Sequence, residues 1–276
     1  MQLRLGDVSF DITHEAIVMG ILNRTPDSFY DRGSYWDIDS FLAKAEALVE
    51  QGADVLDVGG VKAGPGDHVS LDEELQRVVP AIEMLRARFD VPLSVDTWNA
   101  EVLRESLGAG AVVANDISGF ADPLYLKVAA EAEASVVATH IRLGPRIPDP
   151  EPVYRDLVGE VVGFLAERAA SAEEVGIPRD RIMIDAGLDL GKTEPQSMVL
   201  LSASQRLADL GYPLLLSASN KRFLGELFGL DIADRSEMNG AAHALGIARG
   251  CRILRAHDVR AAKQTASFMA LALEAY

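Results

Sequence analysis

Short apolar runs alternate with longer amphipathic segments from one end of the chain to the other. The short runs are rich in β-branched residues and almost continuously apolar, which is typical of strands buried on both faces of a parallel sheet. Eight strands are predicted in this way: Ile17–Leu22, Asp54–Val58, Leu93–Val95, Val112–Asn115, Ser135–Thr139, Ile182–Asp185, Pro213–Ser217 and Arg252–Ala256.

The segments between these runs have the period of amphipathic helices. Several end at a glycine, such as Gly52 and Gly110, as expected where a helix finishes in the left-handed conformation. The predicted helices are Ile38–Gln51, Leu71–Phe89, Ala100–Ala109, Pro123–Glu133, Val153–Val175, Pro195–Leu210, Ser236–Arg249 and Arg260–Glu274.

Eight strand–helix units without a break in composition predict an α/β fold with one closed parallel sheet, the (β/α)8 or TIM barrel. We expect residues 1–276 to form this single domain, and an open doubly wound sheet is the alternative. Before the first strand, Leu3–Ile12 alternates apolar and polar residues around Gly6-Asp7. This pattern predicts an N-terminal hairpin that closes the floor of the barrel.

The composition fits a packed globular protein, with 49% hydrophobic residues, 25% charged residues and a mean hydropathy of +0.10. No apolar run approaches the roughly 18 residues needed to span a bilayer. The first residues carry acids where a signal peptide would carry an apolar stretch. We therefore expect a soluble, cytoplasmic protein with no membrane partner.

The net charge is −16, from 42 acidic and 26 basic residues. Such a surface repels the phosphates of nucleic acids and anionic membranes, so neither is an expected partner. A small anionic substrate would need a local cluster of basic groups. The single cysteine, Cys251, excludes an intrachain disulfide and any multi-cysteine metal site.

Polar residues follow every predicted strand. In a barrel the carboxyl ends of the strands face the active site, so these positions carry the candidate chemistry. Any one of them alone is explained as a helix cap or a turn residue, but all eight groups together predict a site. They are Asn23; Asp57; Asp96 and Thr97; Asn115 and Asp116; His140; Asp185; Ser217, Ser219 and Lys221; and Arg255, His257 and Asp258.

Two subsites are expected among these residues. Several Asp and Asn side chains with one lysine can frame a flat, nitrogen-rich heterocycle, because carboxylates accept hydrogen bonds from ring N–H and amino groups. Arg255 and His257 alternate on the last strand and point to one side, and Asn23 meets them across the barrel seam. This second group suits a phosphate or pyrophosphate, with an ion-paired barrel end as the alternative.

Two glycine-containing stretches do not predict a nucleotide site. Gly59–Gly66 matches neither a Walker A loop nor a dinucleotide-binding turn, and is read as a mobile loop. Gly191-Lys192-Thr193 lacks the upstream glycine of a Walker A loop, so its likeness to the end of that motif is interpreted as coincidence.

Seven motifs, in order along almost the whole chain, resemble those of the dihydropteroate synthase family of pterin-binding barrels. They are Met19–Phe29 (MGILNRTPDSF), Asp57–Gly60 (DVGG), Ser94–Thr97 (SVDT), Asn115–Gly119 (NDISG), Asp185–Gly187 (DAG) with Gly191–Thr193 (GKT), Ser219–Lys221 (SNK) and Arg255–Val259 (RAHDV).

The resemblance implies a transferase of folate biosynthesis, in which para-aminobenzoate displaces pyrophosphate from 6-hydroxymethyl-7,8-dihydropterin pyrophosphate to give 7,8-dihydropteroate. The implied roles follow the motifs. Asp96, Asn115, Asp185 and Lys221 match the pterin-binding residues. Asn23, Arg255 and His257 match the residues that hold pyrophosphate with Mg²⁺, and Asn23 is the implied metal ligand. A homodimer through the last two helices is also implied.

Three departures mark a divergent member. The family's second loop usually reads G-G-E-S-T-R-P-G, whereas Gly59–Gly66 reads GGVKAGPG; the usual S-R-K is Ser-Asn-Lys, with Asn at 220; and Arg24 replaces a small apolar residue. Two expected cations are thus absent. Arg24 and Lys62, together with Ser219, are the candidates for binding the second substrate, an arylamine such as para-aminobenzoate. Restoring the pattern with Ala63→Thr, Gly64→Arg and Asn220→Arg is expected to increase condensation.

The departures leave other functions open. A divergent paralogue would bind the pterin but would have lost or altered its use of aminobenzoate. A related pterin-barrel methyltransferase is a third hypothesis, against which the retained Arg255–Asp258 motif counts. A pterin-binding protein without catalytic activity is the fourth.

Overall fold

The computed structural model describes residues 1–24 and 38–275. Its centre is a closed barrel of eight parallel strands in the order β10-β3-β4-β5-β6-β7-β8-β9, so the predicted barrel is confirmed over the open sheet. The strands are β3 (Ile17–Asn23), β4 (Val55–Gly59), β5 (Leu93–Asp96), β6 (Val113–Asp116), β7 (Ser135–Thr139), β8 (Ile182–Asp185), β9 (Leu214–Leu216) and β10 (Cys251–Ala256).

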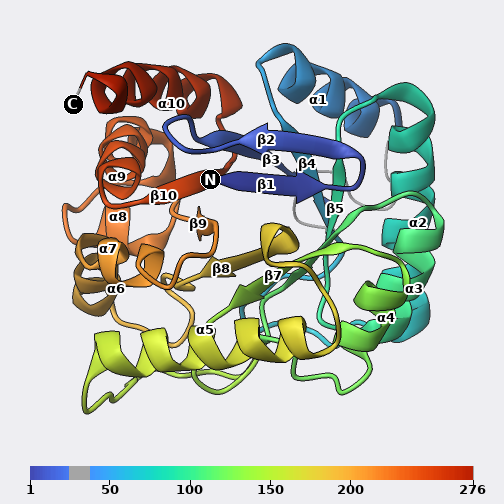
Figure 1. Cartoon of the computed structure of the whole chain (residues 1–276), viewed down its shortest axis with the longest axis horizontal. Helices are drawn as coiled ribbons and strands as arrows, with labels where there is room; N and C mark the ends of the chain where they lie inside the picture. Colours follow the sequence, from blue (N-terminus) through green and yellow to red (C-terminus); the bar gives the residue numbers. More distant parts are fainter. Residues whose placement is uncertain (25–37, 276) are drawn as a thin grey trace.

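Helices surround the barrel (Figure 1). They are α1 (Ile38–Glu50), α2 (Leu71–Arg88), α3 (Ala100–Gly108), α4 (Tyr125–Glu131), α5 (Leu157–Glu174), α6 (Glu194–Ser202), α7 (Ser204–Ala208), α8 (Arg222–Glu226), α9 (Ser236–Ala248) and α10 (Val259–Glu274), with 3₁₀ turns η2 (Arg179–Arg181) and η3 (Ile232–Asp234). In these ranges no helix is both long and apolar enough to cross a membrane.

Two helix predictions need correction, and one helix was missed. The predicted helix 195–210 is two helices, α6 and α7, which meet at Ala203. The helix predicted from Val153 begins at Leu157, because the Asp156 side chain caps it by accepting a hydrogen bond from the Gly159 backbone N–H at 3.0 Å. The short helix α8 was not predicted at all.

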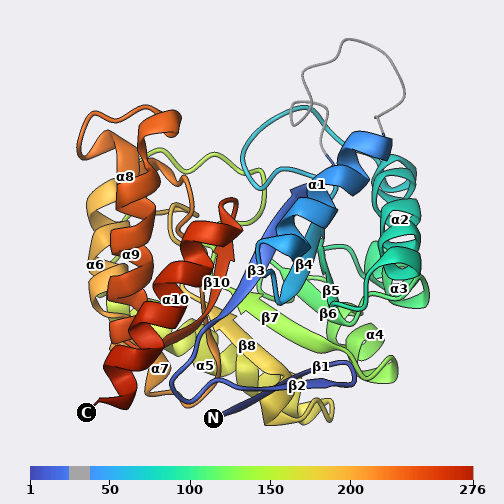
Figure 2. The same cartoon turned by 90° about the horizontal axis from the view of Figure 1, so that it is seen from above.

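The predicted hairpin is present as β1 (Gln2–Leu5) and β2 (Val8–Asp11), paired antiparallel. Its apolar side chains Leu3 and Leu5 are buried and pack with interior residues of the barrel such as Met19 and Val113. Figure 2 shows the hairpin and both chain ends at one end of the barrel, with α8 at the opposite end. The hairpin therefore closes the floor and leaves the carboxyl ends of the strands for a site.

Candidate active site

Strand register brings the predicted residues to one level at the carboxyl end of the barrel. Asn23 pairs with Gly59, Gly59 with Asp96, and Asp96 with Asn115 across three neighbouring strand pairs. The barrel seam closes where Arg255 of β10 pairs with Met19 of β3. Residues that are far apart in the sequence are thus held on rigid strands around one opening.

Asp57 is the centre of the hydrogen-bond network on this level. Its side chain is fully buried, and its Oδ1 accepts a hydrogen bond from Ser94 Oγ at 2.6 Å. Asn115 Nδ2 lies 3.3 Å from both Asp57 oxygens, and Arg255 Nε donates to Oδ2 at 2.6 Å. A buried carboxylate is tolerated when it is paired in this way. The sequence marked Asp57 as a strand-end residue but did not assign it to either subsite.

Arg255 connects the two predicted subsites. Besides Asp57, its guanidinium binds Asp96, with Nη2 donating to Oδ2 at 2.7 Å. Asp96 was assigned to the pterin and Arg255 to pyrophosphate, so the two groups share one ion-paired network. Among residues 1–24 and 38–275, the carboxylate contacts of this guanidinium are made by Nε and Nη2.

The network is rich in negative charge. Burial raises the pKa of Asp96 to about 7; the charge of Arg255 opposes this shift, and the carboxylates of Asp57 and Asp116 add to it. Asp116 itself accepts hydrogen bonds from Ser118 N, Ser118 Oγ and Phe120 N, so it shapes the loop after β6. Such a site favours ligands that carry hydrogen-bond donors or develop positive charge.

Asp185 ends β8 and Lys221 follows β9, which only β10 separates from β3, the strand of Asn23. Asp185 Oδ1 accepts from the Gly187 backbone N–H at 2.8 Å. Gly187 has φ +63°, and a Cβ there would stand 2.0 Å from the His140 carbonyl oxygen, so only glycine fits. Burial raises the pKa of Asp185 and lowers that of Lys221, and in each case the opposite charge of the partner works against the shift.

Lys192 stabilises the loop behind Asp185. Its buried Nζ lies 2.8 Å from His140 Nδ1 and donates to the carbonyl oxygens of His140, Gly187 and Leu190 at 2.9–3.1 Å. These contacts use the ammonium within the protein, which agrees with reading Gly191-Lys192-Thr193 as something other than a phosphate loop. The ring and the carbonyl of His140, a predicted strand-end residue, therefore both contact this lysine.

Asn23 is the predicted metal ligand, and it is half-buried beside Gly59. A Cβ on Gly59 would lie 3.5 Å from Asn23 Oδ1 and 3.5 Å from Asp96 Cβ. In the described ranges no three His, Cys, Asp or Glu side chains are grouped to hold a metal. An amide oxygen suits Mg²⁺, which commonly keeps waters and takes substrate phosphates as further ligands. Asn23 Oδ1 therefore fits as one ligand of a Mg²⁺ ion, and its role as the metal ligand stays a prediction.

The three candidates for the second substrate occupy different surroundings. Ser219 lies at the opening, where its Oγ accepts from the His257 backbone N–H at 3.2 Å. Arg24 is buried, and its guanidinium lies 5.0 Å from the centre of the Phe41 ring on α1. Lys62 is exposed on the loop after β4. The structure brings Ser219 and His257 together, while an aminobenzoate role for Arg24 and Lys62 stays a prediction.

Arg146, which the sequence did not single out, binds the divergent loop. Its backbone N–H donates to the Ala63 carbonyl at 3.0 Å, and its guanidinium donates to the carbonyl oxygens of Lys62 and Asp67. The loop 59–66, expected to be mobile, is therefore tied to the segment after β7. Every residue has a backbone carbonyl, so contacts of this kind do not require particular side chains in the loop. The sequence therefore could not predict them.

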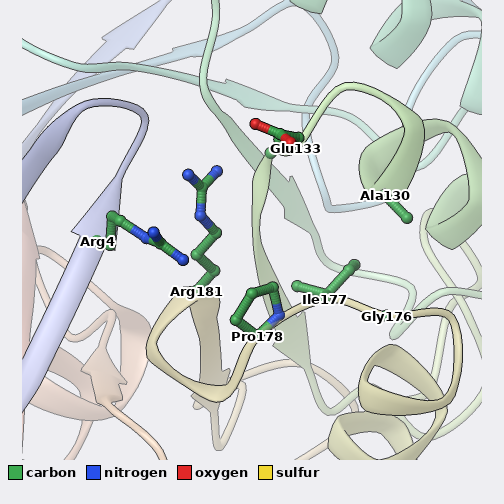
Figure 3. A pocket seen from close by; sticks show the side chains of 8 residues that line it. Arg4, Ala130, Glu133, Gly176, Ile177, Pro178 and Arg181 are labelled. Atoms are coloured by element: carbon green, nitrogen blue, oxygen red, sulfur yellow. The ribbon is translucent and has the colours of Figure 1, made fainter.

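A separate cavity lies at the floor of the barrel (Figure 3). Its arginines attach the hairpin to the barrel, because Arg4 pairs with Asp180 at 3.4 Å and Arg181 Nη2 lies 3.4 Å from the Gly6 carbonyl. None of the predicted site residues lines it. The candidate site is therefore the opening at the carboxyl ends of the strands.

Comparisons of the sequence and of the structure with known proteins find relatives of the same family. The pterin binding enzyme family model matches residues 19–257. The chain is 42% identical to inactive dihydropteroate synthase 2 of Mycobacterium leprae, over 92% of this chain and 89% of that protein. It is 40% identical to dihydropteroate synthase of Bacillus subtilis, over 92% and 88%. The structure of Xanthomonas albilineans dihydropteroate synthase with 7,8-dihydropteroate covers all of both chains, with 38% identity and a TM-score of 0.88.

Proposed function

Because this chain belongs to the pterin-binding enzyme family, among the dihydropteroate synthases, we propose that it condenses 6-hydroxymethyl-7,8-dihydropterin pyrophosphate with para-aminobenzoate to 7,8-dihydropteroate. The observation that carries the proposal is the Asp57–Arg255–Asp96 network, which joins a pterin frame to an anion-binding guanidinium. The activity makes the protein a transferase of folate biosynthesis.

The pterin is held by Asp96, Asn115, Asp185 and Lys221. Carboxylate oxygens of Asp96 and Asp185 accept from ring N–H and amino groups, and Lys221 supplies the donor that an acceptor atom of the ring needs. Since Asp57 fixes Asn115 at 3.3 Å and Gly187 fixes Asp185 at 2.8 Å, these groups are oriented before the substrate arrives. Pre-orientation lowers the entropy cost of binding.

Pyrophosphate is bound by Arg255, His257 and Asn23. Arg255 supplies positive charge to the anion while its Nε and Nη2 hold Asp57 and Asp96. Asn23 would hold a Mg²⁺ ion, which when bound neutralises charge on the leaving pyrophosphate. Positive groups fixed around a leaving anion stabilise the transition state without further reorganisation.

The reaction is substitution at the methylene carbon. The C–O bond to pyrophosphate breaks, its electron pair leaves with the anion, and the amine of para-aminobenzoate forms the new C–N bond and then loses a proton to solvent. The carbon becomes electron-poor as the bond breaks. The carboxylates around Asp96 stabilise positive charge spread over the pterin, and they therefore contribute to the chemical step as well as to binding.

Pterin affinity is expected to depend on pH. The pKa of Asp96 is raised to about 7 by burial, and only the ionised carboxylate accepts from two donors. Affinity should therefore be constant above pH 7 and decline below it, by up to about tenfold per pH unit. Calorimetric titration from pH 5 to 8 measures this, and the Asp96→Asn variant should lack the inflection near pH 7. The same inflection in that variant would exclude Asp96 as its source.

A pterin-binding paralogue without condensation is the second candidate. It is favoured by the altered loop 59–66, which Arg146 holds by its backbone, and by 42% identity to a relative named inactive. A pyrophosphate-release assay, run with and without para-aminobenzoate, separates the two. Release that depends on para-aminobenzoate supports condensation. No release from protein that binds the pterin would establish the paralogue instead.

Assembly and location complete the proposal. The outer helix α10 exposes Phe268 and Leu271, at 69% and 70% of their surface, and it packs beside α9. Exposed apolar side chains of this kind favour a homodimer through α9 and α10. Light scattering should give twice 29.7 kDa at micromolar concentration, and Phe268→Glu should give the monomer mass. A cytoplasmic location agrees with the free, buried thiol of Cys251.

A further inference from the structure

The turn between β9 and α8 has an unusual backbone conformation. Lys221 N–H closes the turn by donating to the Ala218 carbonyl at 3.1 Å, and Asn220 within it has φ +59°. Left-handed φ values are costly for most residues, whereas glycine and asparagine adopt them readily. Residue 220 is therefore constrained by backbone geometry, independently of any contact with a ligand.

The Asn220 side chain is engaged by α9. Asn239 Oδ1 accepts from the Asn220 backbone N–H at 2.9 Å, and Asn239 Nδ2 donates to Asn220 Oδ1 at 2.9 Å. Asn239 is only 9% exposed, so this pair of hydrogen bonds is sheltered from water. The pair holds the amide of Asn220 on α9.

Arg235 holds the same turn from the other side. Arg235 is 8% exposed, and its Nη1 donates to the carbonyl oxygens of Asn220 and Lys221 at 2.9 and 3.1 Å. A Cβ on Gly225 would stand 2.1 Å from Arg235 Nε, so this glycine makes room for the guanidinium. The N–H of Asn220 and the carbonyl groups of Asn220 and Lys221 are therefore all hydrogen-bonded to Asn239 or Arg235.

The residues on either side of Asn220 belong to the site. Ser219 Oγ accepts from the His257 N–H at the end of β10, and Lys221 Nζ donates to the Leu188 carbonyl in the loop after Asp185. A rotation of the backbone at Asn220 would move both side chains at once. The backbone conformation of Asn220 therefore orients both the Ser219 side chain toward His257 and the Lys221 side chain toward Leu188.

We propose that Asn239 and Arg235 are positioning residues, which lock the left-handed turn at Asn220 so that Lys221 meets the pterin and Ser219 meets the last strand. Asn220 is in this view a conformational residue and not an anion contact. The inference rests on the proposed function in that Lys221 binds the pterin. It also means that Asn220→Arg would break the Asn239 pair, so this substitution would not simply restore a missing cation.

Two substitutions at one position separate conformation from contact. Asn220→Gly keeps the left-handed backbone without the amide, whereas Asn220→Val removes the amide and disfavours that backbone. We expect the affinity for 6-hydroxymethyl-7,8-dihydropterin pyrophosphate, measured by calorimetry, to fall about 5- to 30-fold in the valine variant and about threefold or less in the glycine variant. Equal losses in the two variants would overturn the proposal.

Asn239→Leu and Arg235→Lys test the positioning residues directly. Each should lower the pterin affinity of the folded protein about tenfold, because the turn that carries Lys221 is no longer held in a single conformation. Ser204→Ala is the matched control, because it removes a buried hydrogen bond from Ser204 on α7 to the Leu201 carbonyl on α6, outside the site network. It should lower the melting temperature and leave affinity unchanged.

The outcomes are distinguishable from failure of the proposed function. A lower melting temperature with unchanged pterin affinity in both the Asn239 and Arg235 variants would reduce them to structural residues and overturn the inference. A wild-type protein that binds the pterin without condensing it overturns the proposed reaction alone, since the readout here is affinity. A wild type that does not bind the pterin overturns both.

Discussion

Replacing Arg255 with lysine is expected to lower kcat/KM for condensation by about 10²- to 10³-fold, the usual effect of losing one charge-stabilising group in an active site. The guanidinium binds two carboxylates, with Nε donating to Asp57 at 2.6 Å and Nη2 to Asp96 at 2.7 Å, and its charge is the one proposed to bind pyrophosphate. A lysine ammonium is a single point of charge and does not reproduce this planar fork. Steady-state kinetics with each substrate varied in turn measures the loss.

Stability should fall in the same variant, because the fully buried Asp57 loses its hydrogen bond from the Arg255 guanidinium and keeps those from Ser94 and Asn115. Removing one member of a buried ion pair costs about 3–5 kcal/mol; since lysine keeps the charge, a smaller loss is expected in urea unfolding. Arg252→Lys is the control on the same strand, where the side chain binds carbonyl oxygens such as that of Thr13. Its kcat/KM should stay within about twofold of the wild type. A folded Arg255→Lys protein with wild-type kcat/KM would remove Arg255 from catalysis.

The sequence was enough to predict that the site lies at the carboxyl end of the barrel, but not which site residues contact each other. Parallel strands in a barrel all finish at the same end, so Asn23, Asp96, Asn115, Asp185 and Arg255 could be placed together from their positions after apolar runs. Which of them touch depends on strand register and side-chain reach. Asp57 and Arg255 are 198 residues apart in the chain, and no local spacing indicates their ion pair.

Irregular segments were the least predictable part of the fold. The break between α6 and α7 falls at Ala203, a residue type that favours helix and gives no stop signal. The left-handed turn at Asn220 depends on Asn239 and Arg235, which lie later in the chain on α9 and just before it. The family resemblance identified Asn220 as a departure from the usual arginine. The contacts of this residue with Asn239 and Arg235, which only the structure shows, explain how asparagine fits the left-handed turn.

Replacing Asp185 with asparagine is expected to lower pterin affinity by about 2–4 kcal/mol, which corresponds to about 30- to 1,000-fold. The geometry determines which way the new amide faces. Gly187 N–H needs an acceptor at 2.8 Å, so the amide oxygen takes that place and the NH₂ group turns toward the ligand. A donor would then oppose the donors of the pterin, and the nearby Lys221 would lose its negative partner. Asp156→Asn is the matched control outside the predicted site, since its Oδ1 caps α5 through Gly159 N–H and asparagine caps equally well. Calorimetry should give wild-type affinity for the control and a large loss for Asp185→Asn. Equal affinity of the wild type and Asp185→Asn would place the pterin elsewhere, because no orientation of an amide at this position satisfies both Gly187 and a ligand donor.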